Sequence, residues 1–289
     1  MAETYEQWDV VSSVGLTALG VASARAVETN SDDPLVRDPY AADLVRAADP
    51  PVPMPTEPGG ADEEQAQLWA YMADRMAART RFFDEYFERA TEGGATQAVL
   101  LASGLDTRAF RMSWPAGSRV FEIDQPGVLD FKERVLTSLG AEPGCELREV
   151  RTDLRDDWAS ALTDAGFDPQ RRTAWLAEGL LSYLPADAQQ QLLESVDRLS
   201  APGSSLALTA NSRSIRSSST MQAASRHLGV NPRELMHDDD RPAAETTLGE
   251  LGWTAEVRGA HEVGHHYERP LEKYDDDSLQ GSKFVTAHK

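Results

Sequence analysis

Four residues that could bind a small ligand each follow an apolar segment of the chain. Gly104 lies in a short turn of small residues after the first segment, and Asp124, Asp153 and Glu178 follow the next three. In an open parallel sheet the carboxyl ends of the strands line the ligand crevice, so these residues are predicted to converge on one site. A glycine turn in register with three acids favours a binding site over unrelated helix caps or solvated charges.

The residue types in this set indicate the ligand. The turn has a single glycine, so it lacks the GxGxxG pattern that cradles a dinucleotide pyrophosphate. Asp124 stands 20 residues after Gly104, where a carboxylate can accept hydrogen bonds from a ribose diol. The acids suit hydroxyls, amino groups and positive charge, and they repel phosphates. This chemistry favours adenosine joined to an amino acid through a cationic sulfur over NAD or ATP.

A second motif offers a rival chemistry. The sequence HEVGH at 261–265 matches the HExxH pattern of zinc hydrolases, in which two histidines of a helix bind zinc and the glutamate activates water. Gly259 and Gly264 weaken a helix here, so we expect a polar loop or strand edge near the mouth of the active site, and no metal. A zinc hydrolase remains one alternative function. A non-catalytic cofactor-binding protein of the same fold is the other.

The elements that position these residues form an alternating pattern. Apolar strands alternate with helices between residues 97 and 210, which predicts right-handed crossovers and a parallel sheet. The predicted strands are 98–102, 119–123, 146–151, 173–177 and 205–210, and the predicted helices between them are 127–139, 158–165 and 186–200.

The two ends of the chain differ from this core. Leu68, Met72, Met76, Phe83 and Phe87 recur at helical spacing and predict a helix over 61–90. Two final strands are predicted at 253–258 and 283–287, with an antiparallel return between them that lacks a clear helix. We expect one domain over 1–289, made of a helical cap (1–95), a cofactor-binding core (96–210), a helical lid insertion (211–245) and C-terminal strands (246–289).

Composition excludes several classes of protein. Of the 289 residues, 40% are hydrophobic and 26% charged, which is typical of a globular chain. With 28 basic and 48 acidic residues the net charge is -20, which opposes binding to nucleic acid or to an anionic membrane. Cys145 stands alone, so neither an internal disulfide nor a cysteine-based zinc site can form. The apolar runs are too short for a membrane span, and acids at the N-terminus are unlike a signal peptide. These features predict a cytoplasmic protein.

Five motifs occur in one order along the chain: RTRFFD at 79–84, LLASGLDTRAFR at 100–111, FEIDQP at 121–126, TDLR at 152–155 and AEGLLSYLP at 177–185. Together they resemble the S-adenosylmethionine-dependent methyltransferases of the leucine carboxyl methyltransferase family, in particular its actinobacterial branch. The resemblance implies the Rossmann-like fold of class I methyltransferases, which is an α/β fold. Its sheet has seven strands, mostly parallel, and the last strand is antiparallel.

The resemblance also implies contacts to the methionyl part of S-adenosylmethionine. Arg79 would pair with the methionyl carboxylate, and Ala102 and Gly104 would pass beneath the methionyl group. Glu178 would lie near the amino group or the sulfonium. Two alternatives stay open: Arg79 pairs with an acid of its own helix, or Arg81 is the arginine that is used.

The nucleoside part has its own implied contacts. Asp124 would hold the ribose hydroxyls, and Asp153 and Leu154 would contact adenine. Asp106 and Arg108 are expected to form a local ion pair that fixes the glycine turn.

The acceptor implied by the resemblance is the carboxylate of a small molecule or peptide, methylated on oxygen. Tyr183 matches a family tyrosine near the methyl acceptor, although a packing role is as plausible from sequence. An arginine of the lid insertion, Arg213, Arg216 or Arg226, is expected to help orient the acceptor. No catalytic acid or base is predicted, and the oligomeric state is left open.

Overall fold

Seven strands form one sheet in the order β3-β2-β1-β4-β5-β7-β6. This computed structural model describes residues 13–59, 63–211, 222, 225–227, 229–231, 235–237, 239–274 and 281–289. The strands are β1 (Gln97–Leu101), β2 (Arg119–Asp124), β3 (Glu146–Arg151), β4 (Thr173–Ala177), β5 (Ser205–Asn211), β6 (Thr254–Gly259) and β7 (Ser282–His288). The first five are parallel, and β7 runs antiparallel to both β5 and β6. The predicted mostly parallel sheet with an antiparallel last strand is confirmed.

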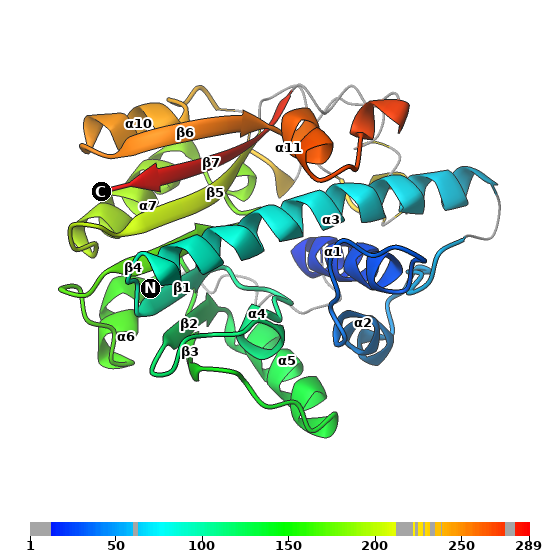
Figure 1. The fold of residues 1–289 in the computed structure, drawn as a ribbon, viewed down its shortest axis with the longest axis horizontal. Coiled ribbons are helices and arrows are strands. Elements are labelled where there is room, and N and C mark those ends of the chain that lie inside the picture. The colour runs from blue at the N-terminus through cyan, green and yellow to red at the C-terminus, as the bar shows by residue number, and fades with distance from the viewer. Residues whose placement is uncertain are drawn as a thin grey trace, which may run out of the picture.

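Helices cover both faces of this sheet (Figure 1). They are α1 (Ser13–Thr29), α2 (Ala41–Ala48), α3 (Glu63–Glu92), α4 (Arg108–Arg111), α5 (Pro126–Ser138), α6 (Trp158–Asp164), α7 (Ala186–Arg198), α10 (Ala244–Glu250) and α11 (Ala260–His266), with 3-10 turns η1 (Leu181–Tyr183) and η3 (Leu271–Tyr274). The long helix predicted over 61–90 is α3. None of the described helices is long and apolar enough to cross a membrane.

The core divides into clusters because the strands are buried on both faces. Val99 and Leu101 of β1 pack with side chains of α6, α7 and α10, whereas Ala98 and Leu100 point the other way, toward α3 and α11. Successive side chains of a strand alternate between faces, so a continuous apolar strand serves both layers. A third cluster joins α1, α2, α5 and the start of α3, and it includes Leu105 from the turn after β1. The N-terminal helices are thereby fixed beside the ends of the strands.

The connection from β6 to β7 corrects the prediction of a return without a helix. It contains α11 and η3, and the HEVGH motif lies on α11. Glu262 accepts a hydrogen bond from the Gly259 N–H (3.1 Å), and Ala260 and Val263 are buried in the cluster beneath α3. At Gly264 a Cβ would lie 2.6 Å from the Arg269 carbonyl oxygen, so glycine permits the tight return of the chain. Tertiary burial here outweighs the low helix propensity of glycine.

About half of the predicted lid insertion lies outside the described residues. The residues left out are 212–221, 223–224, 228, 232–234 and 238, and they include Arg213 and Arg216. Residues 225–227 are helical, and α10 begins at Ala244.

Candidate functional site

A cavity of about 530 Å³ opens at the carboxyl ends of the parallel strands. Cavities of about 300–1,000 Å³ are typical of small-molecule sites. The predicted cofactor-binding residues and Tyr183 line it: Arg79, Ala102, Gly104, Asp124, Asp153, Leu154, Glu178 and Tyr183. Residues more than a hundred positions apart in the sequence thus share one cavity.

The turn after β1 has an unusual backbone. Ala102 has φ +53° and Gly104 has φ +52°, so two left-handed residues flank Ser103. A non-glycine residue in this region costs about 1–3 kcal/mol and is typical of functional sites. Asp124, at the end of β2, fixes the turn, because its carboxylate accepts hydrogen bonds from the N–H groups of Gly104 (2.6 Å) and Gln125 (2.7 Å). Burial raises the pKa of Asp124, and these two N–H donors limit the rise.

Arg79 crosses from α3 to the end of β4. Its Nε donates to Glu178 Oε1 at 2.6 Å, and its guanidinium lies so close to Gly179 that a Cβ there would be 2.9 Å from Nη2. Gly179 also has φ +68°. The alternative in which Arg79 pairs with an acid of its own helix is therefore wrong. Arg81 instead pairs with Glu85 at 2.9 Å and does not line the cavity.

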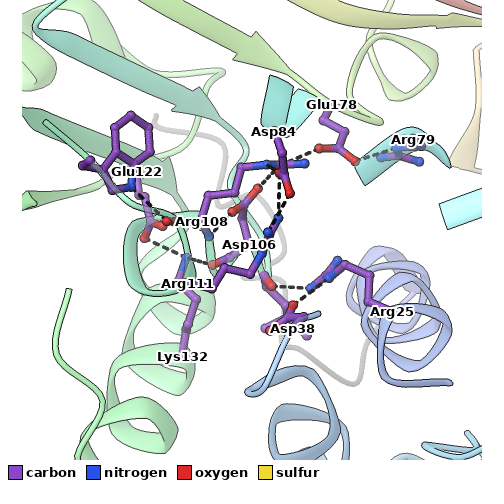
Figure 2. A network of polar contacts seen from close by, with 12 residues as sticks. Arg25, Asp38, Arg79, Asp84, Asp106, Arg108, Arg111, Glu122, Lys132 and Glu178 are labelled. Atoms are coloured by element: carbon purple, nitrogen blue, oxygen red, sulfur yellow. Dashed lines mark hydrogen bonds and ion pairs between the residues drawn. The ribbon is translucent and has the colours of Figure 1, made fainter. Parts of the chain in front are cut away.

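A buried ion network holds the other side of Glu178 (Figure 2). Arg108 donates to Glu178 Oε2 (2.8 Å) and to Asp84 Oδ1 (2.8 Å), and it forms the predicted ion pair with Asp106. Arg111 binds both oxygens of Asp84 at 2.7 Å. The Arg108 side chain is only 3% exposed, so this network is part of the wall of the cavity as well as of the turn.

The network sets the charge of Glu178. Burial by itself would raise the pKa of this carboxyl, but Arg79 and Arg108 together hold it below its ordinary value. Glu178 is therefore ionised at neutral pH, and both of its oxygens are already oriented by an arginine.

A second buried ion pair, between Lys132 and Glu122, supports the turn that follows β1. Lys132 Nζ lies 2.7 Å from Glu122 Oε2 and donates to the main-chain carbonyl of Asp106 (3.1 Å). Both side chains are almost fully buried, and burial raises the pKa of Glu122 to about 7 although Lys132 opposes the rise.

The end of β3 contributes a charged side chain and an apolar one. Asp153 accepts hydrogen bonds from the N–H (2.8 Å) and the Nε (2.9 Å) of Arg155, and from Gln125 Nε2 (2.8 Å). Burial tends to raise the pKa of Asp153, but Arg155 lowers it below its ordinary value. Leu154 lines the cavity beside it.

Sequence reasoning missed Arg25 of α1. This residue lines the cavity, and its guanidinium donates to Asp38 (2.9 Å) and to the Leu105 carbonyl (2.7 Å). The spacing of Thr17, Val21 and Arg25, every four residues, places them on one face of a helix. In the structure all three line the cavity.

His237 was missed as well. It lines the cavity, and its backbone N–H donates to the Ser182 carbonyl (3.0 Å), which ties this loop to η1. Nothing in the local sequence around His237 signals this contact. Arg226, expected near the acceptor, is not among the cavity residues, and its Nε contacts the Gln222 carbonyl at 3.4 Å.

The zinc motif lies away from this site. The expectation that HEVGH forms a loop or strand edge at the mouth is wrong, since it forms α11 and none of its residues lines the cavity. His265 pairs with Glu272 at 3.0 Å, and Glu262 caps its own helix. In the part of the chain that the structure describes, no group of three His, Cys, Asp or Glu side chains could hold a metal ion.

The donor set of the cavity fits a ligand that joins an amino acid to a ribose. Arg79 and Glu178 provide a cation and an anion side by side for a zwitterion, and Asp124 provides an acceptor for a diol. The left-handed turn at Ala102 and Gly104 brings backbone rather than side chains to the cavity. S-adenosylmethionine carries each of the matching groups.

Comparison with known proteins gives one family. The profile of the Leucine carboxyl methyltransferase family matches residues 18–197. A protein of Saccharopolyspora erythraea is 48% identical over 286 residues, which is 98% of both chains. One from Mycobacterium sp. (strain JLS) is 46% identical over 291 residues, 98% of this chain and 97% of the relative. Both are named "Putative S-adenosyl-L-methionine-dependent methyltransferase".

Solved structures share the fold at low sequence identity. A DUF574 family protein from Streptomyces avermitilis superposes with a TM-score of 0.53 at 15% identity, over 92% of this chain and 97% of that one. A "putative methyltransferase" from Thermobifida fusca gives 0.53 at 17% identity, over 93% and 94%.

Proposed function

This chain belongs to the leucine carboxyl methyltransferase family and is a class I, S-adenosylmethionine-dependent methyltransferase, and we propose that it methylates a carboxylate oxygen of its acceptor. The observation that carries this proposal is that three of the four acids among the described cavity residues, Asp106, Asp153 and Glu178, already have arginine partners. Arg79 and Arg108 hold Glu178, and Arg155 holds Asp153. Unpaired acids would repel an anionic acceptor, and the pairing removes much of that repulsion.

The methionyl group of the cofactor binds between α3 and the ends of β1 and β4. Arg79 binds the methionyl carboxylate with its terminal nitrogens, since its Nε is held by Glu178. Glu178 receives the ammonium group or faces the sulfonium. The backbone from Ala102 to Gly104 passes beneath the methionyl chain.

The nucleoside binds at the ends of β2 and β3. Asp124 accepts hydrogen bonds from the ribose hydroxyls with lone pairs that its two backbone N–H donors leave available. Asp153 bonds the adenine, and Leu154 packs against it.

When bound, the cofactor supplies an electrophilic methyl group on a sulfonium, which leaves as a neutral thioether. The acceptor carboxylate is ionised at pH 7 because its ordinary pKa is about 4, so the protein has no proton to remove. Its residues accelerate the reaction by holding the acceptor oxygen in line, an effect that can supply about 7–11 kcal/mol. Tyr183 orients the acceptor with its hydroxyl.

Turnover tests the role of Tyr183. Removing one hydrogen bond, worth about 0.5–1.5 kcal/mol, should lower kcat by about tenfold or less in Tyr183→Phe, with cofactor affinity unchanged. Tyr267→Phe is the matched control, because the Tyr267 hydroxyl donates to Glu85 (2.9 Å) outside the cavity. Equal kcat values in the two variants would remove Tyr183 from the proposal.

Product chemistry and pH dependence test the acceptor class. Carboxylic acids and phenols are screened for release of S-adenosylhomocysteine, and the product is identified as an ester or an ether. With a carboxylate acceptor the rate should be flat from about pH 6 to 8, well above the acceptor pKa. A rate that climbs tenfold per pH unit would indicate a hydroxyl acceptor, from which a proton has to be removed. Cofactor binding without any turnover would favour the non-catalytic alternative.

A further inference from the structure

The cavity has two halves of different chemistry. The half at the strand ends carries the charged groups described above. The other half, called here the acceptor half, is lined by Ala18 and Val21 of α1, Leu180, Leu184 and Ala188 around η1 and α7, and Leu235. These residues come from three separate parts of the chain, and all of them present carbon to the cavity.

Charged groups lie outside this half. Among the described residues that line the cavity, every Asp and Glu belongs to the strand-end half. Arg25 stands one helical turn beyond Val21, and Asp38 and the Leu105 carbonyl hold its guanidinium. The body of an acceptor in this half therefore contacts mainly apolar side chains.

Three polar residues line the acceptor half among the described residues: Thr17, Tyr183 and His237. The Tyr183 hydroxyl is 3.4 Å from Thr17 Oγ1, so this contact joins the wall made by η1 to the wall made by α1. Val21 is one turn along α1 from Thr17, and Leu184 directly follows Tyr183. A single polar end of an acceptor can bond Tyr183 while its body contacts these apolar neighbours.

We propose that the acceptor half binds an apolar body, so that the substrate is a lipophilic small-molecule carboxylic acid and not a peptide terminus. The inference rests on the proposed carboxylate chemistry for its polar end only. Each methylene that leaves water for this half strengthens binding. A peptide would bury several amide groups there beside only three described polar residues, Thr17, Tyr183 and His237, and unpaired buried amides disfavour binding.

A series of acceptors measures this preference. Straight-chain acids from butanoate to octanoate are compared at saturating S-adenosylmethionine. We expect kcat/KM to rise about fourfold per methylene, the factor that corresponds to the transfer free energy of one CH2 group. N-acetylated glycine peptides of similar length carry the same carboxylate on a polar body and should be poor acceptors. Peptides that match or exceed octanoate would overturn the inference.

Charge substitutions locate the effect in the acceptor half. Val21→Asp and Leu184→Asp should each lower kcat/KM for octanoate by at least about tenfold. Val257→Asp is the matched control, because Val257 is an exposed residue of β6 outside the cavity, and its kcat/KM should match the wild type. Unchanged S-adenosylmethionine affinity, measured by calorimetry, shows that each variant is folded. Wild-type octanoate kinetics in both folded cavity variants would contradict the inference.

A ligand that cannot react separates this inference from the proposed function. Octanamide has the same apolar body without an ionised carboxylate, and its binding to the protein loaded with S-adenosylhomocysteine is measured by calorimetry. Binding that Val21→Asp abolishes supports the apolar half, even if no carboxylate is methylated and the proposed function fails. Methylation of polar-bodied carboxylates with no octanamide binding would leave the proposed function standing and overturn the inference.

Discussion

At the scale of single residues, the site depends on carboxylates whose oxygens are fixed before any ligand arrives. Asp124 is held by two backbone N–H groups, and Glu178 is held between Arg79 and Arg108. Groups held in this way lose little freedom on binding, so more of the interaction energy is available for the ligand. The two acids differ in charge environment, because burial raises the pKa of Asp124 whereas the arginines lower that of Glu178.

Removal of the Asp124 carboxylate should weaken cofactor binding. A charge-assisted hydrogen bond is worth about 1.5–3 kcal/mol, so Asp124→Ala should raise the Kd for S-adenosylmethionine about ten- to a hundredfold. Calorimetry measures the change. Asp164→Ala, an exposed acid at the end of α6, is the matched control and should bind as the wild type does. An unchanged Kd in Asp124→Ala would remove the ribose contact from the proposal.

Glu178 should make folding stability depend on pH in the acid range. Its folded pKa lies below its ordinary value of 4.5, so its ion pairs stabilise the fold at neutral pH and are lost as pH falls through the folded pKa. Glu178→Gln should therefore cost about 1.5–3 kcal/mol at pH 7 and progressively less below pH 4.5. Denaturant unfolding of both proteins across this range measures the difference. A cost that stays constant with pH would contradict the charge assignment.

At the scale of elements, the site is formed by the ends of the strands and by two helices, α1 and α3, that lie beside them. The strand ends bring the glycine turn and the acids, α3 brings Arg79, and α1 closes the cavity with Val21 and Arg25. Gly179 marks the close approach of α3 to the end of β4, since its missing side chain leaves room for the Arg79 guanidinium.

A methyl group at Gly179 should displace that guanidinium. Gly179→Ala combines a positive φ of +68° with a Cβ only 2.9 Å from Arg79 Nη2, so we expect a loss of about 1 kcal/mol in stability and a severalfold weaker cofactor affinity. Gly117→Ala is the matched control, with φ +80° and nothing within 4 Å of the added Cβ. It should lose similar stability and retain affinity. Equal affinities in the two variants would argue against a role for Arg79 in cofactor binding.

At the scale of the whole molecule, the cavity lies where the N-terminal helices, the sheet and the segment around residues 235–237 meet. Figure 1 shows α1 packed beside α3 at one end of the sheet, with α2 beside α1. A ligand in this cavity contacts elements from most of the chain, so its binding free energy should couple to global unfolding.

Cofactor binding should therefore raise the unfolding temperature of the entire chain. At a hundred times Kd, S-adenosylmethionine should add about 2.7 kcal/mol to the free energy of unfolding. Calorimetric scans should show one transition that moves upward by several degrees, and the shift should shrink in Asp124→Ala at the same concentration. Two transitions, of which only one responds, would show that the cap and the sheet unfold separately and would contradict the single domain predicted from the sequence.

The sequence alone determined the sheet and the ligand side of the site. Apolar strands alternate with helices, and parallel connections are right-handed, so local patterns lead to one topology. That topology brings the carboxyl ends of the parallel strands to the same edge, which is why Gly104, Asp124, Asp153 and Glu178 could be grouped from their positions along the chain. Each assignment needed only the end of one strand and the type of the residue that follows it.

Only the tertiary structure decided which charges pair and which elements complete the cavity. Arg79 and Glu178 are 99 residues apart, and Arg25 and Leu105 are 80 apart, and hydrophobic periodicity carries no information on such partners. The α11 helix forms despite the low helix propensity of its glycines, because Ala260 and Val263 are buried beneath α3. Local sequence sets propensities of fractions of a kcal/mol per residue, whereas burial and ion pairing depend on neighbours that folding alone brings together.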